Sequence, residues 1–306
     1  MAIVIPVHGA ALAPFNLATK FAVAALFFLY GARLPREVVI AGLVRWRLHL
    51  LTLSITFVLY PALSFLWPLL PGWILAPSLL AGMTYLTCLP STIQSSVALV
   101  ASAKGDVAAA VCSASLSNSA GVVLAPLLVG LLMHAQGAAI SREAVESIFL
   151  QLLVPFALGQ VAHRWLGPAL ARYKDPLTYY DRFTIMLIVY GAFSSAVVGQ
   201  VWRQVSLIQF IGLIGLCAAL LALIMTTCIQ ASRRLGFPVT DEIVVAFCGT
   251  QKGMAAGVPM ASLIFPAPQV GLILLPLIIY HQLQLMTCAV MAGRYARRAQ
   301  AATPLR

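Results

Sequence analysis

The sequence predicts an all-α polytopic membrane protein in which two membrane-spanning helices are interrupted near mid-depth. Hydrophobic residues make up 61% of the 306 positions and charged residues only 9%, whereas soluble domains contain roughly 45–50% and 25%. Apolar stretches such as 15–30 and 207–226 approach the roughly 20 residues that cross a bilayer core. Two of the apolar stretches also contain prolines, glycines and clusters of polar side chains. Together these observations place the chain in lipid.

Hydropathy and helix-breaking residues divide the chain into nine candidate membrane spans. The stretch between residues 168 and 182 is too polar to span, and we predict a loop or an interfacial segment there. The spans are placed at residues 15–32, 48–68, 74–102, 106–133, 145–167, 183–201, 205–230, 241–264 and 269–293.

Basic residues are distributed unevenly between the two sets of loops. Because cytoplasmic loops retain an excess of Lys and Arg, the richer set is predicted to be cytoplasmic, with the C-terminus inside and the N-terminus outside. The poorer set holds only Lys20, Arg142 and Arg203, and Lys252 lies within a span. The richer set holds Arg33, Arg36, Arg45, Arg47, Lys104, Arg164, Arg172, Lys174, Arg182, Arg233, Arg234, Arg294, Arg297, Arg298 and Arg306.

The third and eighth spans are predicted to be discontinuous. In the third, Pro90 is followed by five polar side chains in six residues; in the eighth, Gly249 and Gly253 flank a polar tripeptide. Gln251 lies ten residues after Asp241, so a rise of 1.5 Å per residue puts it about 15 Å deep. Proline removes a backbone donor and glycine weakens a helix. Unwound backbone at that depth is tolerated only where protein or a water-filled cavity satisfies it.

The two interrupted spans are five spans apart, so they enter the membrane from opposite sides. Inverted-topology repeats have this arrangement, and they bring broken helices together at the substrate site of secondary transporters. We therefore predict a single transporter domain, residues 1–306, with an incomplete first repeat at 1–133 and a second repeat at 145–298. The first repeat lacks one helix of a five-helix unit, and residues 1–14 are too short to supply it. Either the protein has nine helices or the chain starts downstream of its natural start.

Several other function classes fit the residues poorly. The net charge of +11 is scattered and forms no patch for nucleic acid. No G-x-x-x-x-G-K-[ST] motif is present, which argues against a self-contained pump. An intramembrane lipid- or acyl-modifying enzyme is an alternative, but it needs a nucleophile with a base or metal-binding carboxylates, and the predicted spans contain no acid. We predict no enzyme activity and no obligatory protein partner.

Several short motifs occur in a characteristic order along the chain. They are Phe27-Phe28-Leu29-Tyr30-Gly31, Leu89-Pro90-Ser91-Thr92, Ser95-Ser96, Ala103-Lys104-Gly105-Asp106-Val107-Ala108, Cys248-Gly249-Thr250-Gln251-Lys252 and His281-Gln282-x-Gln284. From about Phe15 to Arg298 the chain resembles the bile acid:sodium symporter family, and the last motif is similar to its divergent bacterial SBF-like branch.

The resemblance implies a fold, a location and an activity. Family members have a core domain and a panel domain, usually with ten helices, although some lack the first. On that map spans three, four, eight and nine form the core, and spans one, five and six form the panel. The family implies rocking transport of a small organic anion with sodium, here in the bacterial inner (plasma) membrane.

The sequence departs from the family at the expected sodium site. Bile-acid transporters carry a sodium-binding glutamate shortly before the crossover glutamine, whereas Phe247 and Cys248 stand at the corresponding positions here. The residue after Gln251 is typically asparagine in those proteins and is Lys252 here. Sodium coupling is therefore expected from the resemblance alone, and these residues predict weak or absent sodium dependence. A proton-coupled or uncoupled transporter that uses Lys252 is the alternative.

Lys252 is the sharpest candidate, because an intramembrane lysine is costly and usually functional. It has three candidate roles, which are to replace a coupling ion, to hold an anionic substrate, or to pin the carbonyls of the broken helices. A bound sodium ion, the only possible cofactor, is predicted to contact Ser95, Ser96 and Gln251. The predicted substrate and ion site consists of Thr92, Gln94, Ser95, Ser96, Asn118, Thr250, Gln251, Lys252, His281 and Gln282.

Overall fold

A computed structural model describes residues 12–33, 45–72, 74–135, 149–198 and 205–301. These residues form helices and short connections, with no strand among them. The helices are α1 (Leu12–Arg33), α3 (Trp46–Ser54), the π-helix η2 (Ile55–Leu59), α4 (Tyr60–Leu63), the 3₁₀-helix η3 (Ser64–Leu69), α5 (Pro77–Cys88), α6 (Gln94–Ser102), α7 (Val107–Ala135), the π-helix η4 (Phe149–Leu153), α9 (Val154–Arg172), α10 (Lys174–Val198), α11 (Leu207–Arg234), α12 (Val239–Thr250), α13 (Met254–Ile264) and α14 (Ala267–Ala301).

The all-helical membrane fold is confirmed, and each predicted span overlaps helices of the described residues, although residues 145–148 and 199–201 of two spans lie outside the described part. Both predicted interruptions are present, because α5 ends before α6 begins and α12 ends before α13 begins. By length and composition, the described helices long and apolar enough to cross a membrane are Leu12–Arg33, Trp46–Leu69, Val107–Met133, Leu207–Arg234 and Ala267–Gln300. The termini, residues 1–11 and 302–306, lie outside the described part. Their sidedness and the relation between residues 1–133 and 145–298 therefore stay predictions.

The stretch between residues 168 and 182, predicted to be a loop or an interfacial segment, is helical except at Tyr173. The loop alternative is therefore wrong, and the interfacial location stays a prediction. Helix α9 continues to Arg172, and α10 begins at Lys174 after a single residue. Polar side chains mark the end of the apolar part of a span, but a helix satisfies its own backbone and continues into them. As a consequence Asp181, which the hydropathy pattern placed outside the spans, lies within α10.

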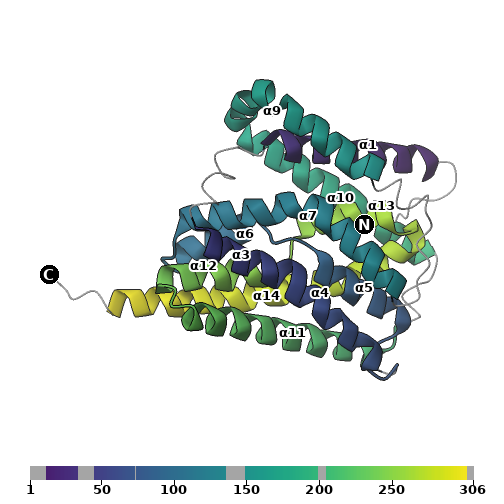
Figure 1. Ribbon diagram of the computed structural model, residues 1–306. Helices are drawn as coiled ribbons and strands as arrows, with labels where there is room; N and C mark the ends of the chain where they lie inside the picture. Colours follow the sequence, from purple (N-terminus) through teal and green to yellow (C-terminus); the bar gives the residue numbers. More distant parts are fainter. Residues whose placement is uncertain (1–11, 34–44, 73, 136–148, 199–204, 302–306) are drawn as a thin grey trace.

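The helices form two layers (Figure 1). One layer consists of α1, α9 and α10, where α1 packs against both others; these are the spans for which the resemblance implied a panel. The second layer, which we call the core layer, contains α3 to α7 and α11 to α14. In it α5 and α11 pack against α14, and α12 packs against α3, α7 and α11. The core layer thus also includes spans two and seven, which the resemblance had not assigned.

Two glycines allow α1 and α9 to pack closely. A Cβ on Gly31 would lie 2.1 Å from Phe156 O, and a Cβ on Gly159 would lie 2.0 Å from Phe28 O. Each helix therefore presents a glycine to the backbone of the other. Small residues permit such close helix packing in membranes, so this reciprocal contact holds the panel layer together.

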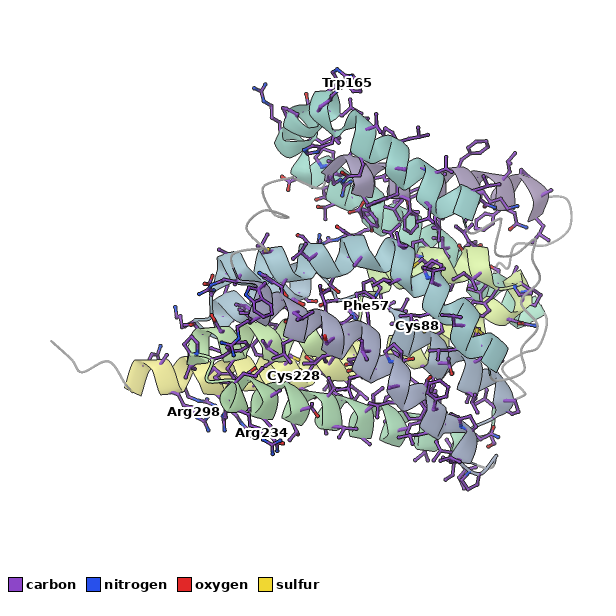
Figure 2. All side chains as sticks on the ribbon, viewed as in Figure 1. Phe57, Cys88, Trp165, Cys228, Arg234 and Arg298 are labelled. Atoms are coloured by element: carbon purple, nitrogen blue, oxygen red, sulfur yellow. The ribbon has the colours of Figure 1, made fainter. Side chains whose placement is uncertain are left out.

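Ion pairs join the core-layer helices at one end of the molecule. Arg45, which precedes α3, lies 2.6 Å from Asp106 and 3.3 Å from Asp241. Arg233 of α11 binds Glu242 of α12 at 2.8 Å and 3.1 Å. Arg234 and Arg298 lie at this same end (Figure 2). The three carboxylates are thus engaged with arginines.

Candidate substrate and ion site

The two helix interruptions lie against each other in the core layer. The backbone N–H of Gly253 donates a hydrogen bond of 2.8 Å to Pro90 O, and the N–H of Ser91 donates one of 3.0 Å to Ser117 Oγ of α7. The predicted crossing of the broken helices is therefore present. Four helix ends converge on it: the C-terminal ends of α5 and α12, and the N-terminal ends of α6 and α13.

The ammonium of Lys252 binds the C-terminal end of α5. Its Nζ donates hydrogen bonds to the carbonyl oxygens of Leu89 at 2.7 Å, Thr87 at 3.0 Å and Thr56 at 3.2 Å. It also lies 3.9 Å from the centroid of the Tyr60 ring, and the side chain is fully buried. Three roles were considered for Lys252: replacing a coupling ion, holding an anionic substrate, or binding the carbonyls of the broken helices. In this conformation its ammonium binds carbonyls.

The C-terminal end of α12 is capped by tyrosine hydroxyls. Tyr60 Oη donates to Thr250 O at 2.8 Å, and Tyr280 Oη approaches the same oxygen at 3.0 Å. The two hydroxyls lie 2.5 Å from each other. The two hydroxyls have two protons between them for three contacts. One hydroxyl therefore donates to Thr250 O, and the other can donate either to Thr250 O or to the first hydroxyl.

Gln284 of α14 holds the backbone of the second interruption. Its Oε1 accepts a hydrogen bond from the N–H of Lys252 at 2.8 Å, and its Nε2 donates to Lys252 O at 3.1 Å. The same Nε2 lies 2.8 Å from His281 Nδ1. Because an amide nitrogen is only a donor, Nδ1 accepts this shorter bond; Nδ1 also lies 3.4 Å from Lys252 O.

Three neutral oxygens meet where α6 begins. Ser95 Oγ donates a hydrogen bond of 2.5 Å to Gln251 Oε1 and is also hydrogen-bonded to Thr92 Oγ1. Ser96 Oγ instead contacts Ser91 Oγ at 3.4 Å. Two of the residues predicted to contact sodium, Ser95 and Gln251, are thus in contact, and the third faces a different partner. The residues described by the structure include no group of three or more His, Cys, Asp or Glu that could hold a metal ion.

A cavity of about 440 Å³ lies between the two layers beside the crossing. The residues of the predicted site divide into three groups around it. Those that line the cavity are Thr92, Gln94, Ser95, Asn118 and His281. Those that are fully buried and lie outside its lining are Ser96, Thr250, Gln251 and Lys252. Gln282 lies on the exposed side of α14 and belongs to neither group.

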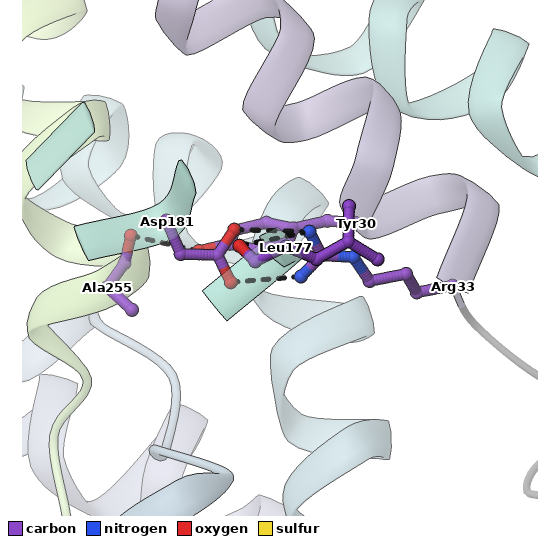
Figure 3. Close-up of polar contacts among 5 residues, drawn as sticks. All are labelled: Tyr30, Arg33, Leu177, Asp181 and Ala255. Atoms are coloured by element: carbon purple, nitrogen blue, oxygen red, sulfur yellow. Dashed lines mark hydrogen bonds and ion pairs between the residues drawn. The ribbon is translucent and has the colours of Figure 1, made fainter. Parts of the chain in front are cut away.

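The cavity is electropositive. Gln94, the first residue of α6, and Met254, the first residue of α13, both line it, and helix N-termini carry partial positive charge. The charged residues in its lining are Arg33, Asp181 and Arg182. Arg33 binds Asp181 at 2.9 Å and 3.3 Å (Figure 3). No ion pair of Arg182 is found within the described ranges, so one guanidinium charge is left unbalanced.

One hydrogen bond beside the cavity connects the two layers. Tyr30 of α1 donates from Oη to Ala255 O in the first turn of α13 at 3.4 Å (Figure 3). Nearer the N-terminal end of α1, a second cavity of about 260 Å³ lies between the same layers and is lined by Lys20, Ser195 and Ser262 among others. Two cavities thus lie along the interface between the layers.

Several residues of this region did not stand out in the sequence. Hydropathy places Asp181 and Arg182 in a loop or an interfacial segment, and Tyr60 and Tyr280 look like ordinary aromatic residues of apolar spans. Gln284 belonged to a recognised motif, yet Gln282 was chosen from it. Helical spacing was the available signal, because Gln284 lies three residues after His281 and shares its face.

A bundle of two helical layers, with two interrupted helices crossing beside a cavity, is the architecture of secondary membrane transporters. A family model described as the SBF-like CPA transporter family matches residues 1–297. The chain belongs to this family and is an integral membrane protein.

The chain is also similar to curated proteins over nearly its whole length. An uncharacterised protein of Pseudomonas aeruginosa is 46% identical over 300 residues, which are 97% of this chain and 90% of the relative. A protein of Escherichia coli named "Putative symporter YfeH" is 44% identical over 295 residues, 96% of this chain and 89% of the relative. Sodium/bile acid cotransporter 7 of Mus musculus is 28% identical over 292 residues, 93% and 85% of the two chains.

Proposed function

We propose that this protein is a secondary active transporter that carries a small organic anion across the membrane, with the cavity at the helix crossing as its substrate site. The observation that carries the proposal is the convergence on one cavity of two half-helix N-termini and Arg182, which forms no ion pair with the described residues. Helix N-termini and guanidinium groups both bind carboxylate or phosphate oxygens. The cavity volume of about 440 Å³ also falls within the roughly 300–1,000 Å³ of small-molecule sites.

Movement of one layer against the other would give alternating access. The hydrogen-bonded network around Lys252 joins η2, α5, α12 and α14, which all belong to the core layer. It can therefore move as a unit, while the cavity and the Tyr30 contact lie at the interface with the panel layer. If the basic loops are cytoplasmic, the cavity beside Arg33 and Arg182 faces the cytoplasm in this conformation.

We propose that sodium does not drive this transport, although the name of the sodium/bile acid cotransporter relatives favours it. The oxygens of Thr92, Ser95 and Gln251 are neutral, and no carboxylate is among their hydrogen-bond partners in the described part of the chain. A proton gradient, or the anion gradient alone, is then the driving force. An intramembrane enzyme is less well supported, because the relatives with an assigned activity are named as transporters or symporters.

A thermal-shift screen of purified protein tests substrate and coupling ion together. We expect at least one carboxylate, sulfonate or phosphate ester to raise the melting temperature to the same extent in sodium, potassium and choline buffers, because a ligand that binds only the folded state stabilises it. Arg182→Gln should lose this response. Arg172→Gln should keep it, since Arg172 is exposed outside the cavity lining.

The two parts of the proposal fail separately. A response of Arg182→Gln equal to that of the wild type, or no response to any anion, contradicts the substrate site. Stabilisation that appears in sodium but not in potassium or choline contradicts the sodium-independent coupling and leaves the anion site standing.

A further inference from the structure

We propose that Lys252 is a tethered cation that fills a monovalent-cation site formed by backbone carbonyls, and that shortening its side chain leaves a site which binds a free alkylammonium ion. The site is formed by the carbonyls of Thr56, Thr87 and Leu89 with the ring of Tyr60 on one side. It lies outside the cavity lining, so the inference does not depend on the proposed substrate.

The π-helix η2 leaves one carbonyl, that of Thr56, without its usual main-chain donor. In the π-helix η2 the N–H of Tyr60 bonds to Ile55 O, five residues earlier. The next bond in that register would run from residue 61 to Thr56 O, but Pro61 has no N–H to give. Thr56 O accepts from Lys252 instead. The sequence thus places an acceptor for the ammonium by placing a proline one turn later.

The end of α5 supplies the other two acceptors. The N–H of Ser91 is the helical partner that Thr87 O would have four residues later, but it donates to Ser117 Oγ. Leu89 O lies beyond the last helical residue, Cys88, and precedes Pro90. Both carbonyls accept from the ammonium of Lys252, which therefore replaces missing main-chain donors at three positions.

A cation suits this position better than a neutral donor. The C-terminal end of a helix carries partial negative charge, an aromatic face attracts a cation, and an ammonium has three N–H donors for three acceptors. The end of α12 provides a contrast within the same structure, because its Thr250 carbonyl is capped by the neutral hydroxyls of Tyr60 and Tyr280. One half-helix end is thus closed by a charge and the other by hydroxyls.

Chemical rescue of truncated variants tests the site. Lys252→Ala removes the atoms that n-propylammonium can restore, whereas Lys252→Met fills most of the space without a charge. We expect both variants to melt at lower temperature than the wild type. Saturating n-propylammonium chloride should raise the melting temperature of Lys252→Ala by several degrees, because the ion binds only the folded state. Lys252→Met and the wild type should not respond, and choline chloride controls for ionic strength.

A second measurement addresses the origin of the acceptors. Pro61→Ala gives residue 61 an N–H for Thr56 O, so the ammonium has one fewer carbonyl to satisfy. Lys252→Met should therefore lower the melting temperature less in the Pro61→Ala background than in the wild type, a coupling that a double-mutant cycle measures.

Several outcomes would overturn the proposal. In the rescue experiment, these are wild-type melting temperatures of both Lys252 variants, or an equal response of both variants to n-propylammonium. Failure to recover folded Lys252→Ala even when membranes are solubilised with the amine present would also count against it. In the double-mutant cycle, the contrary result is that the effects of Pro61→Ala and Lys252→Met are additive. All of these readouts are stabilities, so loss of the proposed anion site would leave them unchanged.

Discussion

At the residue scale, the crossing depends on side chains that take over hydrogen bonds from the interrupted backbone. Gln284 holds both the N–H and the carbonyl of Lys252, while Tyr60 and Tyr280 share the carbonyl of Thr250. An unsatisfied buried carbonyl costs more than an ordinary hydrogen bond contributes. These side chains therefore stabilise a conformation that the chain would otherwise avoid inside a membrane.

Either Tyr60 or Tyr280 should be sufficient to cap the Thr250 carbonyl when the other hydroxyl is removed. Because either hydroxyl reaches Thr250 O, Tyr280→Phe alone should lower the free energy of unfolding by at most about 1 kcal/mol. Tyr60→Phe together with Tyr280→Phe leaves the carbonyl unsatisfied and should cost about 1–3 kcal/mol more than the sum of the single variants. Denaturant unfolding in detergent measures this difference, and additive single effects would contradict the shared cap.

The choice between Gln282 and Gln284 illustrates the limit of the sequence at this scale. Both glutamines are unusual in an apolar span, and composition alone does not say which one faces the crossing. The distinction depends on how α14 is rotated against α12 and α5, which is a property of tertiary packing. Lys252 was found for the opposite reason, because a lysine near mid-membrane is unusual whatever it contacts.

At the element scale, the panel layer depends on the close approach of α1 and α9. Gly31→Ala and Gly159→Ala each place a Cβ about 2 Å from a backbone oxygen of the other helix, so the helices must move apart. We expect each variant to lose about 1–3 kcal/mol of stability. Gly130→Ala in α7 is the matched control, because nothing lies within 4 Å of its added Cβ. Equal stability of the three variants would exclude the close packing.

Element boundaries were predictable where a break changes the chemistry of the chain. Pro90 and the polar residues after it marked the end of α5, and Gly249 to Gly253 marked the end of α12. The connection between α9 and α10 was not predictable from hydropathy, because polar residues occur in an exposed helix as readily as in a loop. Asp181 and Arg182 were therefore not predicted as site residues. Their place in the cavity lining depends on α10 beginning at Lys174.

At the scale of the whole molecule, the proposed alternating access requires the two layers to expose the same cavity to one side of the membrane and then to the other. The core layer carries the crossing, the Lys252 network and both half-helix N-termini. The panel layer contributes the Arg33–Asp181 pair and Arg182. The cavity has walls from both layers, so under the proposed mechanism a change in their relative position would change which side it opens to.

Sided labelling of a cavity cysteine tests this claim most directly. Ser119 lines the cavity, and the six native cysteines are all buried, so Ser119→Cys adds one reactive thiol. We expect a membrane-impermeant thiol reagent to label it in both right-side-out and inside-out vesicles, whereas Arg298→Cys, at the end of α14, should be labelled from one side alone. Labelling of Ser119→Cys in only one of the two vesicle preparations would contradict alternating access.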